Sequence, residues 1–189
     1  MAKLYGFKFD REIADQQWRL LIAHSFSSPI EPVTEKPPTF FLYSEENISA
    51  SLCELLPVME SDLACQIGAI ICHNNEAFTQ AALDLAFQYQ RGQLLNLADV
   101  CLIASIKNEV AFLNQLKNYF NDTEEELLHT AIAFLQNSLS GLKTAEHLYI
   151  HRNTLSYRLN KLQQLKKLNI HDFDDAAFLR FWYFYARNN

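Results

Sequence analysis

A cluster of basic side chains in the last third of the sequence has the residue types that bind a polyanion. Residues 142–171 hold six lysine and arginine side chains and a single acidic one, Glu146. The six are Lys143, Arg152, Arg158, Lys161, Lys166 and Lys167. This segment therefore has a formal charge of +5, whereas the rest of the chain has −11. A basic segment on an acidic chain indicates a polyanion-binding surface; a solvated basic face without a partner is the alternative.

The pattern around these residues is typical of a helix-turn-helix. It predicts a short helix over residues 142–148, a turn over 149–151 and a longer amphipathic helix over about 152–165. Ala145 lies where the two helices must approach closely. Four apolar residues would fix the angle between the helices: Leu148, Ile150, Leu155 and Leu159.

The second helix of this pair presents side chains that can bond to base edges and phosphates, and its N-terminal N–H groups attract phosphate as well. Arg152 suits a bidentate contact to guanine and Asn153 one to adenine, although a lone arginine more often binds phosphate. The residues expected to contact double-stranded DNA are Lys143, His151, Arg152, Asn153, Thr154, Ser156, Tyr157, Arg158 and Lys161.

Two of these residues have alternative roles. His151 is interpreted as a helix N-terminal residue that contacts phosphate, but a pH-sensitive or a purely structural role is the alternative. Arg158 could instead point back toward an acidic residue of its own domain. Lys161, Lys166 and Lys167 are at best nonspecific phosphate binders.

The same segment resembles a known family. Residues 144–159 read TAEHLYIHRNTLSYRL, similar to the C-terminal, Fis-like helix-turn-helix of the purine-catabolism-regulator (PucR) and sugar-diacid-regulator (CdaR) families. The resemblance extends over about residues 124–188. It implies a bacterial transcription regulator that binds operator DNA. Residues 138–141 replace the usual Asn-Gly-type turn and Leu142 replaces a polar residue, which alters the turn more than the docking helix.

The sequence changes character near residue 108. Residues 1–108 predict a small α+β unit with two or three strands, and residues 109–189 predict helices only. The expected fold class is therefore mostly α (α+β), with the helix-turn-helix at 142–165. Residues 78–82 and 97–99 resemble parts of a degenerate, shortened GGDEF-like domain, without the signature for cyclic-dinucleotide synthesis. The first unit is expected to sense a small molecule or to mediate assembly.

Local patterns predict the elements of this first unit. A helix over about residues 13–22 has Asp10 as its N-cap, and a surface loop follows over 25–38. A strand is expected at 39–43 and a short buried run at 65–72. A helix lies between Asn74 and Gly92, and residues 94–106 form either a strand with a short helix or one buried helix.

In the second unit, a helix over about residues 110–120 precedes a capping box of Thr123 and Glu126, which opens the next helix. Ser140 and Gly141 would end that helix. The last helix follows residues 172–175, and its expected stripe is Ala177, Phe178, Phe181, Trp182 and Tyr185. The stripe is interpreted as core or dimer interface rather than as a base-stacking surface. Tyr183 and Phe184 lie off it and suit a second subunit, so a homodimer that reads two half-sites is expected.

Composition excludes several classes. Only 4 Gly and 5 Pro in 189 residues exclude collagen-like and low-complexity chains, and 49% hydrophobic residues suffice for a core. The four cysteines lack zinc-site or disulfide spacing and are expected to be reduced core residues, so no metal or cofactor is expected. Nucleotide-binding and hydrolase motifs are absent, so an enzyme is not expected. Without a membrane span or a signal peptide, a cytoplasmic location is expected.

Two other functions fit the same sequence. The helix-turn-helix could have lost DNA binding and serve as a dimerisation or protein-interaction module. The chain could also bind a metabolite, the effector, without acting on DNA.

Overall fold

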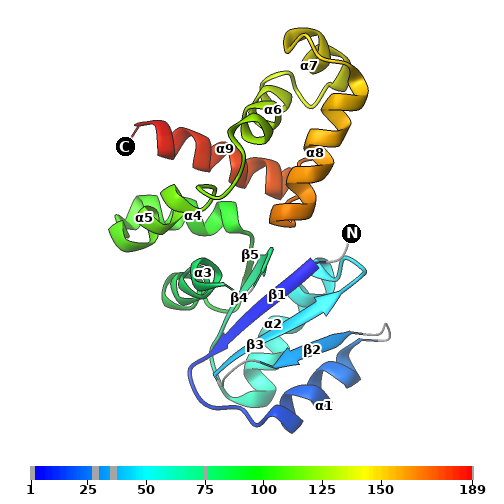
Figure 1. Cartoon of the computed structure of the whole chain (residues 1–189). Coiled ribbons are helices and arrows are strands. Elements are labelled where there is room, and N and C mark those ends of the chain that lie inside the picture. The colour runs from blue at the N-terminus through cyan, green and yellow to red at the C-terminus, as the bar shows by residue number, and fades with distance from the viewer. Residues whose placement is uncertain (1–2, 27–29, 35–37, 75, 189) are drawn as a thin grey trace. The chain divides into compact units, whose positions relative to one another are not determined.

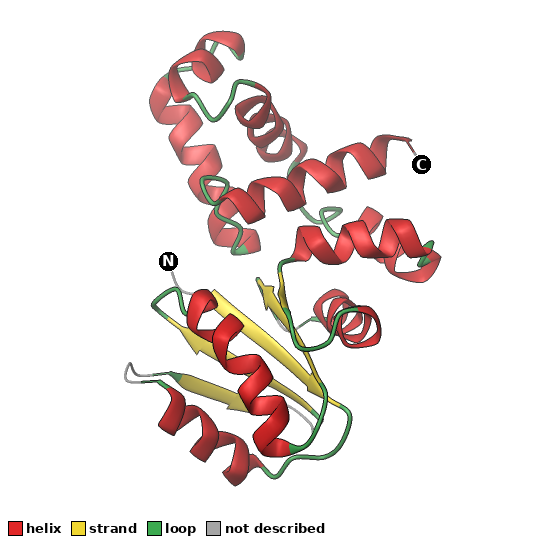
Figure 2. Cartoon of the chain, turned by 180° about the vertical axis from the view of Figure 1, so that it is seen from behind, coloured by secondary structure: helices red, strands yellow, loops and turns green. Residues whose placement is uncertain are grey.

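The computed structural model describes residues 3–26, 30–34, 38–74 and 76–188. The chain divides into two compact units, Met1–Asn108 and Glu109–Asn189. The first unit contains a sheet with helices, and the described elements of the second are all helices (Figure 2). The mostly α (α+β) fold class is therefore confirmed.

The sheet of the first unit is built around its first strand. The strands are β1 (Lys3–Phe9), β2 (Glu31–Thr34), β3 (Thr39–Ser44), β4 (Ile67–Cys72) and β5 (Leu94–Leu95), in the order β2-β3-β1-β4-β5 (Figure 1). β1 is antiparallel to both β3 and β4, β2 is antiparallel to β3, and β4 and β5 are parallel. The described residues thus contain five strands where the sequence predicted two or three.

Helices α1 (Asp15–Ser25) and α2 (Ser49–Leu63) cover one face of this sheet (Figure 2). Alternate side chains of β1 point to that face, because successive side chains of a strand point to opposite sides. Phe7 and Phe9 pack there against Trp18, with ring centroids 5.1 and 5.6 Å from it. All three are buried, so the aromatic core lies between the sheet and α1.

Helix α3 (Ala77–Tyr89) packs on the other face, and a glycine permits its close approach. A Cβ atom at Gly68 of β4 would lie 2.6 Å from the backbone of Phe87 in α3, so only glycine fits. An ion pair between Lys8 of β1 and Asp84 of α3 lies on the same side.

Several predictions for this unit are wrong in detail. The sequence patterns did not predict β1 and α2, and the expected 25–38 loop contains β2. Residues 27–29 and 35–37 of that loop lie outside the described residues. Asp10 does not cap α1, which starts at Asp15 with Ala14 at its N-cap. Glu76, not Asn74, is the N-cap of α3. Residues 94–106 form β5 and α4 (Leu97–Lys107), with a capping box between Asn96 and Asp99.

The cysteines are free, and one of them does not lie in the core. Cys53 is exposed, which corrects the expectation that all four are core residues. Burial raises the pKa of the Cys72 and Cys101 thiols, so both stay protonated. In the part of the chain that the structure describes, no group of three His, Cys, Asp or Glu side chains could hold a metal ion. No described helix is long and apolar enough to cross a membrane.

The second unit is a helical bundle. Its helices are α5 (Val110–Asn118), α6 (Glu125–Gln136), α7 (Gly141–His147), α8 (Arg152–Lys166) and α9 (Phe173–Asn188). Phe120 contacts Trp182 and Phe178 of α9, with ring centroids 4.5 and 6.2 Å apart. The buried residues of α9 are Ala176, Phe178 and Leu179, so the predicted stripe is wrong in part: Phe181, Trp182 and Tyr185 are only half-buried.

The helix boundaries in this unit also differ from the predicted ones. The capping box of Thr123 and Glu126 is wrong, because Glu124 is the N-cap of α6 and makes no side-chain cap hydrogen bond. Ser140 and Gly141 do not end α6. The chain leaves α6 through Ser138 and Leu139, both with positive φ, and the Ser140 hydroxyl caps α7 by accepting from the Lys143 N–H at 3.4 Å.

Candidate nucleic-acid interface

Helices α7 and α8 form a helix-turn-helix. Ala145 of α7 is buried, as are Leu155 and Leu159 of α8, so small and apolar side chains fill the space between the helices. The turn begins after α7 with Tyr149 in the left-handed conformation (φ 53°). The Ile150 N–H donates back to the Ala145 carbonyl at 3.0 Å, and this bond closes the turn. The apolar pattern in the sequence thus sets the angle at which α8 is presented.

The N-terminus of α8 is capped by a histidine. His151 is the N-cap residue, and its Nδ1 accepts a hydrogen bond from the Asn153 N–H at 3.2 Å. This bond needs a lone pair on Nδ1, so the capping imidazole carries its proton on Nε2. His151 therefore has a structural role in the helix start, which was one of the alternatives in the sequence analysis.

One face of α8 consists of exposed polar side chains. Arg152, Asn153, Ser156 and Tyr157 are all exposed, and they share a face because residues four apart lie side by side on a helix. Thr154 is half-buried at the edge of this face. The structure adds one residue that the sequence analysis missed: Asn160 is exposed four residues beyond Ser156. The spacing alone could have identified it.

Ion pairs beside this face hold α8 to the start of α6. The Arg158 guanidinium pairs with Glu126 and donates to the Thr130 hydroxyl at 3.3 Å. Lys161 pairs with Glu124 at 2.5 Å, and this hydrogen bond raises the pKa of Lys161.

A third pair joins the end of α8 to the segment before α6. Lys166 pairs with Asp122 and donates to the Tyr119 carbonyl at 3.0 Å. Its hydrogen bond to Asp122 lowers the pKa of that carboxyl. Three of the six basic residues of the 142–171 segment therefore form ion pairs inside the unit. For Arg158 this is the alternative given in the sequence analysis, in which the side chain points toward an acidic residue of its own domain.

The remaining cations are few. Neither Lys143 nor Arg152 has an ion-pair partner among residues 3–26, 30–34, 38–74 and 76–188, and both are exposed. Lys167 follows the last residue of α8, about 22 Å along the helix from Arg152 at 1.5 Å per residue. Of the nine predicted DNA-binding residues, six are thus exposed and Thr154 is half-buried. The other two, Arg158 and Lys161, anchor α8 through ion pairs.

A short helix, a tight turn and a second helix with an exposed polar face, supported by a helical bundle, define a helix-turn-helix domain. Residues 127–181 match the model of the PucR C-terminal helix-turn-helix domain. This part of the second unit is therefore similar to the PucR-type helix-turn-helix domains, as the resemblance implied.

Relatives with known names match this chain over stretches of different length. The chain is 40% identical over 58 residues to the carbohydrate diacid regulator of Escherichia coli (strain K12), which is 31% of this chain and 15% of the relative. It is 32% identical over 78 residues to the purine catabolism regulatory protein of Bacillus subtilis (strain 168), or 36% of this chain and 15% of that protein. A "leucine-rich protein" of Streptococcus dysgalactiae subsp. equisimilis is 28% identical over 165 residues, 79% of this chain and 58% of the relative.

This chain thus spans less than two thirds of the length of each of these relatives. Among solved structures, the regulator of polyketide synthase expression from Bifidobacterium adolescentis matches with a TM-score of 0.48 at 14% identity, over 98% of this chain and 80% of that one. The predicted GGDEF-like character of the first unit stays a prediction.

Proposed function

We propose that this chain is a transcriptional regulator that binds operator DNA through the helix-turn-helix of its second unit. The observation that carries the proposal is the exposed polar face of α8, which begins with Arg152 and Asn153 and is presented at an angle fixed by the buried α7–α8 contact. The PucR-type match over residues 127–181 supports it, because the exposed face lies within the matched region.

In this proposal α8 enters the major groove with its N-terminus first. Arg152 would make a bidentate contact to guanine or bind phosphate, and Asn153 would contact adenine. Ser156, Tyr157 and Asn160 would follow along the same groove, and Lys143 of α7 would bind phosphate. Arg158 and Lys161 would act indirectly, because their ion pairs with Glu126 and Glu124 set the orientation of α8.

One helix-turn-helix reads a short site, so we propose that the protein acts as a homodimer on two half-sites in the cytoplasm. The first unit would sense a small-molecule effector or mediate assembly. The role is regulatory rather than enzymatic.

A protein-interaction module is the second candidate, and one observation favours it. Large apolar side chains near the helix-turn-helix are exposed: Tyr149 at 96% and Leu142 at 73%. Exposed apolar side chains of this size suit contact with a protein partner.

The test is the binding of labelled genomic-fragment duplexes at two salt concentrations, followed by fluorescence anisotropy. Arg152→Ala combined with Asn153→Ala should weaken binding roughly thirtyfold or more, since each base contact contributes on the order of 1–3 kcal/mol. Both side chains are exposed, so the fold should persist, which circular dichroism would verify. Arg180→Ala is the matched control, because it removes an exposed arginine of α9 outside the helix-turn-helix.

Salt-sensitive binding that the double variant loses and Arg180→Ala keeps would support the DNA-binding proposal. No binding to any duplex at low salt would contradict it and favour the interaction module. Stabilisation by a metabolite without any effect on DNA would favour the metabolite-binding function.

A further inference from the structure

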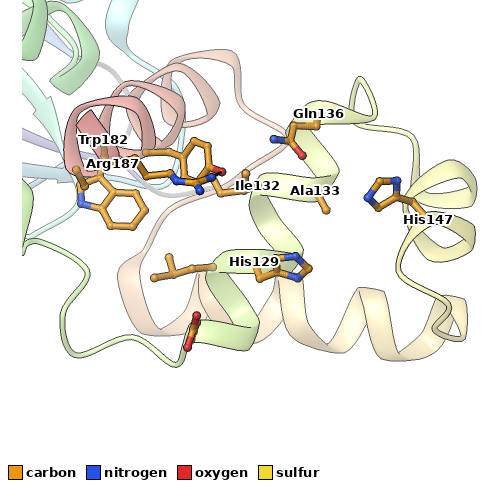
Figure 3. Close-up of a pocket in the computed structure, with 11 residues that line it drawn as sticks. His129, Ile132, Ala133, Gln136, His147, Trp182 and Arg187 are labelled. Carbon is orange, nitrogen blue, oxygen red and sulfur yellow. Dashed lines mark hydrogen bonds between the residues drawn. The ribbon is translucent and has the colours of Figure 1, made fainter. Parts of the chain in front are cut away.

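The second unit contains a pocket that the proposed DNA contacts do not use. Its volume is about 490 Å³, which lies in the range of small-molecule sites. Helix α6 forms the floor between residues 125 and 136, α9 contributes Trp182 and Arg187 on one side, and α7 contributes His147 on the other (Figure 3). The pocket is thus built from three helices of one compact unit.

The middle of this pocket is apolar. Ile132 and Ala133 of α6 line it and are at most 7% exposed, and Ala186 of α9 lines it as well. The indole N–H of Trp182 donates to the Lys117 carbonyl at 3.4 Å, which holds the ring in place. A rigid aromatic ring beside small aliphatic side chains suits a flat apolar group.

Polar side chains surround this apolar surface, and most of them are hydrogen-bond donors. Arg187 donates to the Tyr183 hydroxyl, and a guanidinium has five N–H donors, so further donors stay available. Gln136 and His147 line the same pocket. Within the described part of the chain, neither side chain has a hydrogen-bond partner in the protein.

Charge is distributed unequally along the pocket. The carboxylate that lines it, Glu125, is in the first turn of α6, four residues from His129, so the two side chains lie on the same face of the helix. Gln136 is 11 residues further along α6, about 16 Å away. The end of the pocket where Gln136 lies is therefore far from the Glu125 carboxylate.

From this arrangement we propose that the pocket binds a small organic anion. Arg187 and Gln136 bind its carboxylate or a similar anionic group, because a guanidinium and an amide both donate to such oxygens. Its apolar body lies on Ile132 and against Trp182. This ligand site is independent of whether the protein binds DNA.

The experiment uses the full chain and a matched pair of probes, naphthylacetate and its neutral isostere naphthylacetamide. Binding is followed by NMR through the two indole N–H resonances, since the chain has two tryptophans and Trp18 is fully buried in the first unit. The Trp182→Phe variant assigns the resonances. Naphthylacetate should shift the Trp182 resonance and leave that of Trp18 unchanged.

Two variants test the charge. Arg187→Gln should weaken naphthylacetate binding about tenfold, the loss expected for one charge-assisted contact. Arg180→Gln removes an arginine on the same helix that does not line this pocket, and it should leave the affinity unchanged. The neutral amide should bind at least about tenfold more weakly than the acid.

Three results would overturn the proposal. The first is no naphthylacetate-induced shift of the Trp182 resonance. The second is equal affinity for the acid and the amide, or an undiminished affinity in Arg187→Gln, because the pocket would then not select an anion. The third is a Trp182 resonance that moves on dilution of the protein but not with the probe, because a second copy would then occupy this surface. None of these measurements involves DNA, so they fail or succeed independently of the proposed function.

Discussion

Tyr149 is the residue of the helix-turn-helix whose conformation fits its side chain least. It lies in the left-handed region with φ 53°, and 96% of its surface is exposed. A side chain other than glycine costs about 1 kcal/mol there, and this exposed ring recovers little of that cost by burial. The left-handed backbone at Tyr149 ends α7, because it lets the Ile150 N–H reach the Ala145 carbonyl.

We therefore expect Tyr149→Gly to raise the free energy of unfolding of the second unit by about 1 kcal/mol, because glycine adopts this conformation without strain. Urea unfolding followed by Trp182 fluorescence would measure it. Tyr157→Gly is the control, since the same replacement inside α8 should lower the free energy by about 1 kcal/mol. A loss of stability in Tyr149→Gly would show that the tyrosine ring stabilises the fold.

The contact between α3 and the sheet depends on Gly68 having no Cβ atom. We expect Gly68→Ala to lower the free energy of unfolding of the first unit by about 1–3 kcal/mol, because its Cβ would approach the Phe87 backbone to 2.6 Å. Thermal unfolding followed by Trp18 fluorescence would measure this. Gly141→Ala should be neutral or slightly stabilising, since its Cβ would meet only Leu155, at 3.8 Å. An unchanged melting temperature in Gly68→Ala would mean that α3 can shift on the sheet.

The ion pair between Lys166 of α8 and Asp122, before α6, should make the second unit sensitive to acid. The Lys166 hydrogen bond lowers the pKa of the Asp122 carboxyl from its ordinary value of 3.8. A lowered pKa means that this carboxylate stabilises the fold above 3.8, and that the contribution disappears as the pH falls through the lowered value.

Asp122→Asn should therefore lower the free energy of unfolding at neutral pH by up to about 1 kcal/mol, because the carboxyl is largely exposed. The difference from the parent protein should vanish at acidic pH, and urea unfolding over a pH series would measure it. In a Lys166→Gln background the same change should have no pH-dependent effect. A difference that persists in acid would contradict the assignment to this pair.

The elements that could be predicted from the sequence are those whose pattern is local. The helix α8 followed from Leu155, Leu159 and Leu162, which recur at helical spacing and are all buried. The helix α2 did not, because Pro57 lies in its interior and no side chain caps its start. The central strand β1 was missed although Phe7 and Phe9 alternate on one face, since its pairing partners are more than 30 residues away.

In the candidate site, too, the features that could be predicted are those that depend on residues close in the sequence. The exposed face with Arg152 and Asn153 follows from spacing along one helix, so the sequence predicted it. Whether Arg158 and Lys161 are free to contact DNA depends on acidic residues 32 and 37 positions earlier in the sequence. No spacing rule relates such distant positions. Likewise, Glu126 was predicted to cap its own helix, but its carboxylate pairs with Arg158 across the bundle.

At the scale of the whole molecule, these ion pairs reduce the positive charge available for the proposed contacts with DNA. If all six basic residues of the 142–171 segment met phosphates, the logarithm of affinity would fall with the logarithm of salt concentration with a slope of roughly −5 per protomer. With three of them paired internally, we expect roughly −3 per protomer. Anisotropy titrations over a salt series would measure the slope.

Two lysine variants make this expectation specific. Lys143→Gln should make the slope shallower by about 1, whereas Lys161→Gln should leave it unchanged. Equal effects of both would mean that Lys161 leaves Glu124 to bind phosphate.

The two edges of the sheet in the first unit limit how copies of the protein can join. One edge is β2, a strand of four residues that includes Pro32, and proline has no N–H to donate to a further strand. The other edge is β5, which has only two residues. Short or proline-containing edges discourage strand addition from another molecule. The edges of this sheet therefore disfavour edge-to-edge aggregation. A dimer of this unit would form through side-chain contacts between surfaces, and not through a sheet that continues from one copy into the next.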